Sequence, residues 1–194
     1  TSFFDQSTTS PPGTIVQWSW NFADATPFDT NASTSHLYAY PGNYNVVHTV
    51  MSSDGCIDSI IKPVVVHPNP VVDFIGEPDH GCSPLCVTFH DMSAVLTGNN
   101  VGWNWNFGDG SSSSLQNPEH CFVNNSSTDQ AVFDVTLVVE SDEGCQTDLR
   151  KENYITVFPK PIAGFSYLPS VTTLIYPGIQ FNDLSQHATQ WNWD

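Results

Sequence analysis

Side chains suited to metal binding or catalysis gather around a glycine-containing turn of this 194-residue chain. Asn106 and Asp109 flank Gly108, and their oxygens could either bond the amides of the turn or bind calcium. Calcium takes about six to eight oxygen ligands, and the turn offers few. We therefore expect a structural role for this pair, with a calcium site at Asn106 and Asp109 as the alternative. No other cofactor is expected.

Two histidines, His36 and His120, follow turns of this kind. A histidine that recurs at one structural position more often satisfies buried backbone groups than performs catalysis. The chain contains no nucleophile elbow, His-Glu-x-x-His pair, phosphate-binding loop or dinucleotide fingerprint. We therefore expect these residues to contain no enzyme.

The five cysteines are Cys56, Cys82, Cys86, Cys121 and Cys145. Cys82-x3-Cys86 has no second cysteine pair at matching spacing, which disfavours zinc. A composition poor in lysine and rich in Ser, Thr and Asn is typical of secreted proteins, where cysteines more often form disulfides. Disulfides are expected, and the spacing alone leaves several pairings open.

The composition excludes several classes of protein. Twenty acidic and four basic residues give a formal charge of −16, so the chain lacks the basic surface that nucleic-acid binding needs. Aromatic residues make up 12%, enough apolar surface to fold rather than stay disordered. No run of about 18 apolar residues is present, so we expect no membrane insertion within this segment.

An internal repeat determines where these residues lie. Trp-x-Trp motifs begin at Trp18, Trp103 and Trp191, at intervals of 85 and 88 residues. Phe-x-Asp-x-Ser at 3–7 recurs at 89–93 and 181–185, and Gly-Cys at 55–56 recurs at 144–145. Pro-x-Pro segments at 68–70 and 159–161 are typical of short, stiff linkers.

The repeats predict three domains: 1–70, which lacks its first strand, 71–161, which is complete, and 162–194, the first part of a third. The counterpart of Cys82 in the first repeat falls before Thr1, so we expect the chain to be an excerpt of a longer one. Alternating apolar residues, as in 16–22 and 133–139, predict strands, and turn signals separate them. Val16 is expected on the same face as Trp18, and His48 at the inward position that Leu137 occupies in the second repeat, in contact with a sheet edge. The expected class is all-β: tandem Ig-like Greek-key β-sandwiches.

The motif Trp-Asn-Trp-Asn-Phe-Gly-Asp-Gly at 103–110, followed by Asn-Pro-Glu-His-Cys-Phe at 117–122, resembles a polycystic-kidney-disease (PKD) domain. The first repeat keeps Trp-Asn-Phe at 20–22, Ser-His-Leu-Tyr at 35–38 and Pro-Gly-Asn-Tyr-Asn-Val at 41–46. It has Ala23 and Ala25 where the pattern has glycine, which leaves the geometry of that turn open. The resemblance covers nearly the whole chain.

The resemblance implies that the repeated aromatic and histidine residues form a structural core motif, with sugar stacking by exposed Trp as the alternative. Its members are Trp18, Trp20, Phe22, His36, Trp103, Trp105, Phe107, His120, Trp191 and Trp193. It also implies a Cys82–Cys145 disulfide, because Cys82 precedes one sheet's strand and Cys145 follows a strand expected nearby. Cys86 and Cys121 replace ordinary strand residues of the family, which implies a second bond, Cys86–Cys121. Cys56 then has no partner within the chain, and other pairings stay open.

The repeat style is similar to that of the giant cell-surface adhesins and gliding-motility proteins of Bacteroidota, which are usually exported by the type IX system. This resemblance implies an extracellular, cell-surface location and a non-catalytic role as stalk, spacer or adhesive surface. The partners would be neighbouring repeats of the same long chain and a surface glycan or protein ligand. The alternative is an accessory substrate- or carbohydrate-binding module of a secreted hydrolase.

Overall fold

The computed structural model describes residues 1–168, 170–171, 175 and 177–193, and these residues form β-strands joined by turns and loops. Within these residues there is no helix that could span a membrane. The expected all-β class is confirmed. Two compact units are present, one made mainly of residues 1–69 and the other beginning at Pro70.

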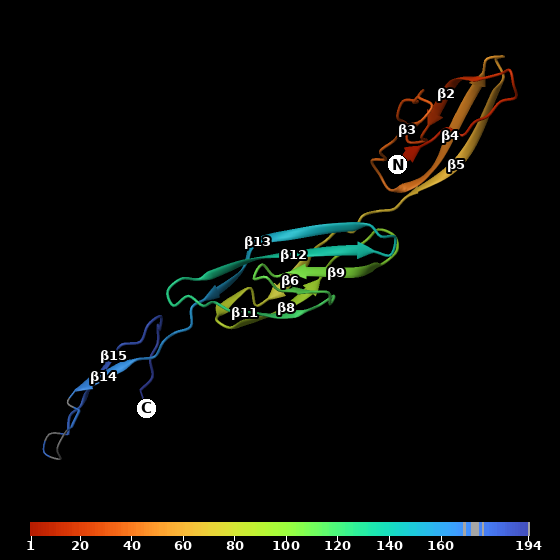
Figure 1. Cartoon of the computed structure of the whole chain (residues 1–194). Helices are drawn as coiled ribbons and strands as arrows, with labels where there is room; N and C mark the ends of the chain where they lie inside the picture. The colour runs from red at the N-terminus through yellow and green to blue at the C-terminus, as the bar shows by residue number, and fades with distance from the viewer. Residues whose placement is uncertain (169, 172–174, 176, 194) are drawn as a thin grey trace. The chain divides into compact units, whose positions relative to one another are not determined.

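The second repeat consists of two facing sheets (Figure 1). The larger sheet has the strand order β10-β9-β12-β13-β7, and the smaller has the order β11-β8-β6. Neighbouring strands are antiparallel except β13 and β7, which pair in parallel. Their bounds are β6 Phe74–Glu77, β7 His80–Cys82, β8 Leu85–Asp91, β9 Asn100–Asn106, β10 Ser112–Ser113, β11 Glu119–Phe122, β12 Ala131–Ser141 and β13 Gln146–Phe158.

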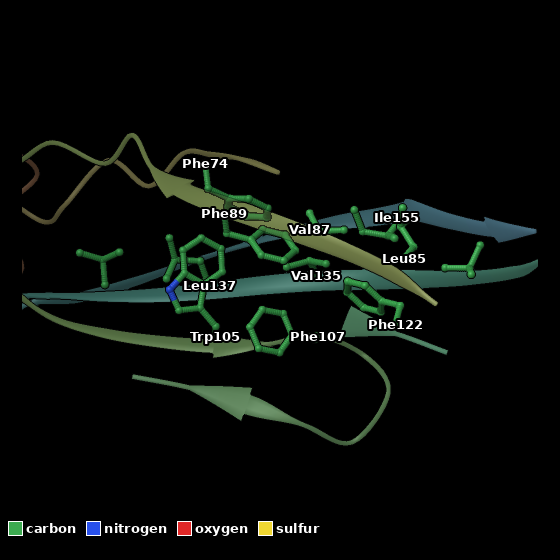
Figure 2. Packing of buried hydrophobic residues seen from close by; sticks show 12 residues of the cluster. Phe74, Leu85, Val87, Phe89, Trp105, Phe107, Phe122, Val135, Leu137 and Ile155 are labelled. Carbon is green, nitrogen blue, oxygen red and sulfur yellow. The ribbon is translucent and has the colours of Figure 1, made fainter. Parts of the chain in front are cut away.

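Alternating apolar residues build the core between these sheets. On β12 the side chains of Val135, Leu137 and Val139 are fully buried, as their spacing predicts for one face of a strand. Phe74 and Phe89 from the smaller sheet point toward Trp105 and Leu137 of the larger one (Figure 2). The Trp105 ring centroid lies 5.1 Å from that of Phe74 and 5.3 Å from that of Phe89. Trp105 is therefore enclosed by both sheets.

The first repeat has the same kind of strands but a smaller core. Its sheets have the orders β2-β4-β5 and β1-β3. The buried apolar core consists of Trp20, Phe22 and Val46, with Phe3 and Val64 among the side chains packed against it. Beside this core is a depression of about 960 Å³, lined in part by His48 and Ile60. The strand bounds are β1 Ser2–Phe3, β2 Ile15–Asn21, β3 Thr34–Ser35, β4 Gly42–Ser52 and β5 Ile57–Val66.

One predicted core residue of the first repeat was wrong. Val16 is half exposed, whereas Trp18 and Trp20 on the same strand turn inward. The pairing of β2 with β4 shifts register between Ile15 and Gln17, so Val16 is the extra residue of a bulge. The strict alternation predicted from the sequence therefore begins only after Val16.

The segment expected as a third repeat contains one described strand pair. Strand β14, Phe165–Leu168, pairs with β15, Gln180–Asp183, in antiparallel register. Residues 169, 172–174, 176 and 194 of this segment lie outside the described residues. The domain bounds given above stay a prediction.

Candidate functional site

The turn after β9 is held by its own side chains. The Asn106 Oδ1 accepts a hydrogen bond from the Gly108 amide at 2.9 Å, and the Asp109 Oδ1 accepts one from the Ser111 amide at 2.9 Å. In the first repeat Asn21 and Asp24 make the equivalent bonds to the Ala23 and Thr26 amides. The side-chain oxygens therefore have the turn-bonding role expected for them.

A histidine fixes each turn to the following strand. The His120 Nε2 lies 2.7 Å from the Asp109 Oδ2, and the His36 Nε2 lies 2.6 Å from the Asp24 Oδ2. Each imidazole also stacks on a core phenylalanine, at a centroid distance of 4.2 Å for Phe107–His120. We call this set of carboxylate, imidazole and phenylalanine the turn lock. Backbone groups were the expected partners of these histidines, and the carboxylate is the one observed.

The contacts of the turn lock stabilise the ionised carboxylates. Hydrogen bonds from Thr26 and then His36 lower the pKa of Asp24 to about 2. Burial raises the pKa of Asp109, but hydrogen bonds from Ser111 and His120 outweigh that effect and hold the pKa below its usual range. Both carboxylates thus stay ionised while they hold the turn.

The oxygens that could bind calcium already accept hydrogen bonds within the turn. Asp109 directs one oxygen to the Ser111 amide and hydroxyl and the other to His120, while Asn106 directs its oxygen to the Gly108 amide. A cation would therefore compete with these hydrogen-bond donors for the oxygens. Among the described residues, the one group that could offer three metal ligands is Cys86, Glu119 and Cys121, and both of its cysteines are in a disulfide. Calcium binding at Asn106 and Asp109 stays a prediction that titration would test.

Ser111, His120 and Asp109 lie together but are not arranged as a catalytic triad. The Ser111 Oγ is 3.1 Å from the His120 Nε2, the same ring nitrogen that contacts Asp109. In a triad the carboxylate and the hydroxyl bind opposite ring nitrogens, so that the imidazole can take a proton from one side while it is held from the other. The cluster therefore explains the shape of the turn rather than a reaction.

In the first and second repeats, each tryptophan of the repeated motif has its indole N–H bonded. In the second repeat the Trp105 Nε1 donates to the Leu115 carbonyl at 2.8 Å, and the Trp103 Nε1 donates to the Asp91 Oδ2 at 2.7 Å. In the first, Trp20 donates to the Asn31 carbonyl, and Trp18 donates to Asp5. Trp20 and Trp105 are buried, and Trp18 and Trp103 are half-buried. These contacts fit the packing role.

Asp5 and Asp91 have a role that was not predicted from the sequence. Each carboxylate joins its Trp to the Ser two positions later, because its Oδ1 accepts a bond from the Ser7 or Ser93 amide. The signal was present in the repeated Phe-x-Asp-x-Ser, where a carboxylate recurs at a fixed distance from a core phenylalanine. His48 is buried, as expected for its inward position, and it stacks on Trp20 with its Nε2 3.1 Å from the Asp5 Oδ1.

The cysteines are arranged differently from the expected pairing in one respect. Cys86 on β8 and Cys121 on β11 face each other in register and form a disulfide. The expected Cys82–Cys145 bond was wrong, because both are free thiols. Cys82 pairs with Phe158 at the end of β13, while Cys145 directly precedes its first residue, Gln146. A strand of 13 residues separates the two by about 40 Å.

The remaining members of the expected core motif are Trp191 and Trp193. Both are about half exposed, at 54% and 53%, unlike their counterparts in the second repeat. Together with Phe165 and Phe181 they line a depression of about 920 Å³ in the third segment. The ring centroids of Trp193 and Phe165 are 5.8 Å apart, so the aromatic residues gather there without being enclosed.

The fold and the repeated turn lock define a class of protein. It is the tandem immunoglobulin-like β-sandwich in which the polar motif has a structural role. A family model described as PKD domain matches residues 1–66 and 67–157, so the chain belongs to the PKD domain family and carries the domain in tandem. PKD domains are typical of extracellular proteins and are generally non-catalytic modules.

Two solved structures are similar to parts of the chain. The PKD1 domain of the Vibrio cholerae metalloprotease PrtV is 27% identical, with 46% of this chain and 96% of that one covered and a TM-score of 0.37. The PKD1 domain of Vibrio anguillarum Epp is 25% identical, with coverage of 47% and 99% and a TM-score of 0.38.

Proposed function

We propose that this chain is a non-catalytic extracellular segment that acts as a stalk or spacer, with a lateral adhesive surface, in a large cell-surface protein. The observation that carries this proposal is that the polar residues of the repeated motif bond to groups within their own domain. In both repeats the carboxylates and imidazoles that could perform chemistry hold the turn, and the indole N–H groups anchor the core. The net charge of −16 favours solubility and repels like-charged neighbours.

Antibodies against the chain test its location. We expect them to label intact, unpermeabilised cells of the source organism. Labelling that appears only after permeabilisation would contradict the proposed location.

Beads coated with the chain test its role in adhesion. We expect them to bind the organism's natural substrata more than beads coated with a Trp105→Ala variant, whose second repeat is unfolded or loosened. Equal binding by the two kinds of beads would contradict the proposed adhesive surface and would leave only the spacer role. Transport by gliding and export by the type IX system belong to the same proposal, and they predict loss of the surface label in cells that lack that exporter.

The alternative role, as an accessory carbohydrate-binding module, has one observation in its favour. Trp191 and Trp193 are exposed beside Phe165 and Phe181, and exposed aromatic rings can stack on sugars. Affinity electrophoresis in polysaccharide gels tests it. Retardation of the chain that is lost in Trp191→Ala and kept in Trp103→Ala would favour this role over the stalk.

A further inference from the structure

The core of the second repeat is covered by a strand that has no counterpart among the described residues of the first. Strand β6 pairs with β8, and its Phe74 is fully buried against Trp105 (Figure 2). In the described part of the first repeat, β1 pairs with β3 alone. The depression beside Trp20, which Phe3 also lines, takes the place of the covering strand. The first repeat therefore leaves open an apolar face that a strand covers in the second.

The aromatic walls of the depression have the same geometry as the walls that hold β6. The ring centroid of Phe3 lies 5.6 Å from that of Trp20 and 5.2 Å from that of Phe22. In the second repeat the corresponding distances from Phe89 are 5.3 Å and 5.2 Å. The side chains that receive a strand are therefore already in place in the first repeat.

A lysine at the rim of the depression provides a hydrogen-bond donor for such a strand. Lys62 is in register with Val46, as Lys151 is with Val135 in the second repeat. There the Lys151 Nζ donates a hydrogen bond to the backbone carbonyl of Phe74, on the covering strand. Lys62 is exposed and lines the depression. An ammonium group thus lies where the carbonyl of a bound strand would accept its hydrogen bond.

Ile60 on β5 adds an uncovered apolar side chain. It is in register with His48, as Leu149 is with Leu137 in the second repeat. Leu149 is half-buried and packs against the core, whereas Ile60 lines the depression and is 53% exposed. A bound strand would cover this side chain, and burial of apolar surface favours association. An open strand edge beside such a pocket is the arrangement that binds peptides by strand addition.

The second repeat also shows which strand fits. The third residue of β6 is Gly76, and a Cβ there would lie 2.7 Å from the ring of Phe89. Phe3 has the place of Phe89 in the first repeat, so a strand bound there needs glycine at its third position. Strand β14 has Tyr167 at its third position and therefore does not fit. The pattern that fits is phenylalanine followed two positions later by glycine.

We infer that the first repeat binds an extended strand of another polypeptide, with phenylalanine at the first position of the strand and glycine at the third. The bound strand lies antiparallel along β1, as β6 lies along β8. Its phenylalanine ring packs on Trp20, and the carbonyl group of that phenylalanine accepts a hydrogen bond from Lys62. The inference goes beyond the proposed stalk and does not depend on it, because its test measures peptide binding by the purified chain.

The experiment is titration of the 194-residue chain into a fluorescently labelled peptide with the sequence of residues 70–77. We expect a rise in anisotropy that fits one binding site, and slower amide exchange in β4–β5 but not in β12–β13. Peptides with Phe74→Ala or Gly76→Val should bind at least about tenfold more weakly. The first loses the buried ring, and the second brings a side chain against Phe3.

Two neighbouring isoleucines of β5 provide a matched pair of variants of the chain. Ile60 lines the depression, whereas Ile61 is 62% exposed and does not line it. Ile60→Glu should weaken binding of the peptide at least about tenfold, and Ile61→Glu should leave it unchanged. Lys62→Met, which removes the hydrogen-bond donor, should weaken binding about fivefold. Amide exchange of each free variant, compared with that of the unmodified chain, confirms that it is folded.

Any of three results would overturn the inference. The first is equal binding of the unmodified peptide and both peptide variants, or equal weakening by Ile60→Glu and Ile61→Glu, which indicates unselective contact. The second is a change of amide exchange in β12–β13, which means that the peptide replaces β6 in its own domain. The third is sedimentation of the chain alone as oligomers that the peptide dissociates, which means that the bound strand belongs to a second copy.

Discussion

The first and second repeats share their local contacts and differ in the core around them. Both have the turn lock, the bonded tryptophans and the same hairpin turn before a cysteine. In the second repeat Phe74 and Phe89 from the smaller sheet close over Trp105. In the first repeat Trp20 borders an open depression. The turn and its lock thus form without a complete opposite sheet, whereas the depth of the core depends on it.

Substitution of the core tryptophan should give the largest difference in stability between the two repeats. Trp105→Ala removes a fully buried indole and should cost about 3–5 kcal/mol, while Trp20→Ala should cost less because its cavity opens to the depression. Amide exchange read separately in β12–β13 and β4–β5 measures each repeat's stability.

The control for this pair is Trp191→Ala, which removes a half-exposed side chain and should leave both strand pairs unchanged. Equal losses for Trp105→Ala and Trp20→Ala would show that the two cores are equivalent after all.

The Cys86–Cys121 bond should stabilise the second repeat alone. It closes a loop with a sequence separation of 35 residues, which corresponds to about 3–4 kcal/mol in the chain-entropy model. Dithiothreitol, or the double substitution Cys86→Ser and Cys121→Ser, should lower the free energy of unfolding of the second repeat by this amount, as measured by urea unfolding. In the first repeat Leu37 stands at the position of Cys121.

Cys82→Ser serves as the matched control, because this thiol forms no bond within the domain. An equal decrease in both repeats on reduction would contradict a local role for the disulfide.

The third comparison concerns the turn residues. Ala23 and Ala25 adopt positive φ angles of 60° and 66°, as Gly108 and Gly110 do at 78° and 93°. The turn is therefore kept in the first repeat despite the loss of both glycines. Alanine is strained in this region by about 1–2 kcal/mol, so Ala25→Gly should stabilise the first repeat by about 1 kcal/mol after the entropy of the unfolded chain is counted.

The reverse change should be unequal at the two glycines. A Cβ on Gly110 would meet no atom within 4 Å, whereas one on Gly108 would lie 2.4 Å from the Asp134 carbonyl oxygen. Gly110→Ala should therefore cost about 1 kcal/mol, and Gly108→Ala about 2 kcal/mol or more. Urea unfolding measures both, and equal costs would mean that the backbone near Asp134 moves aside.

Periodicity and repetition made the sheets and the core motif predictable. The inward face of a strand follows from alternation along a few neighbouring residues, and each repeated motif is a short stretch of sequence. The bulge at Val16 was not predictable, since it depends on how β2 pairs with β4. The Cys82–Cys145 pairing failed for a similar reason. Strand order brought Cys82 beside Phe158, at the end of β13 remote from Cys145, and no spacing in the sequence records that. The partner of His120 was missed because the carboxylate belongs to the turn between β9 and β10, 11 residues earlier in the chain.

The smallest expected difference lies in the acid response of the turn locks. A carboxyl whose folded pKa is lowered contributes stability above its ordinary pKa of 3.8 and loses it as the pH falls through the folded value. For Asp24 that window runs from about pH 4 to about pH 2. Asp24→Asn and Asp109→Asn should flatten the fall in urea midpoint of their own repeat across this range, while Asp148→Asn, at an exposed position, should not.

At pH 6 we expect Asp109→Asn to cost the second repeat about 1 kcal/mol, because its hydrogen bonds lose their charge. Asp24→Asn should also lower the urea midpoint of the first repeat, because Asp24 and His36 are no more open to solvent than Asp109 and His120 are, with side chains 12% and 13% exposed against 22% and 18%. For each variant, the urea midpoint can be plotted against pH beside that of the unmodified chain. If the two curves are parallel, the carboxylate does not hold the turn. A larger effect at Asp24 would mean that the first repeat, with its smaller core, depends more on its lock than the second does.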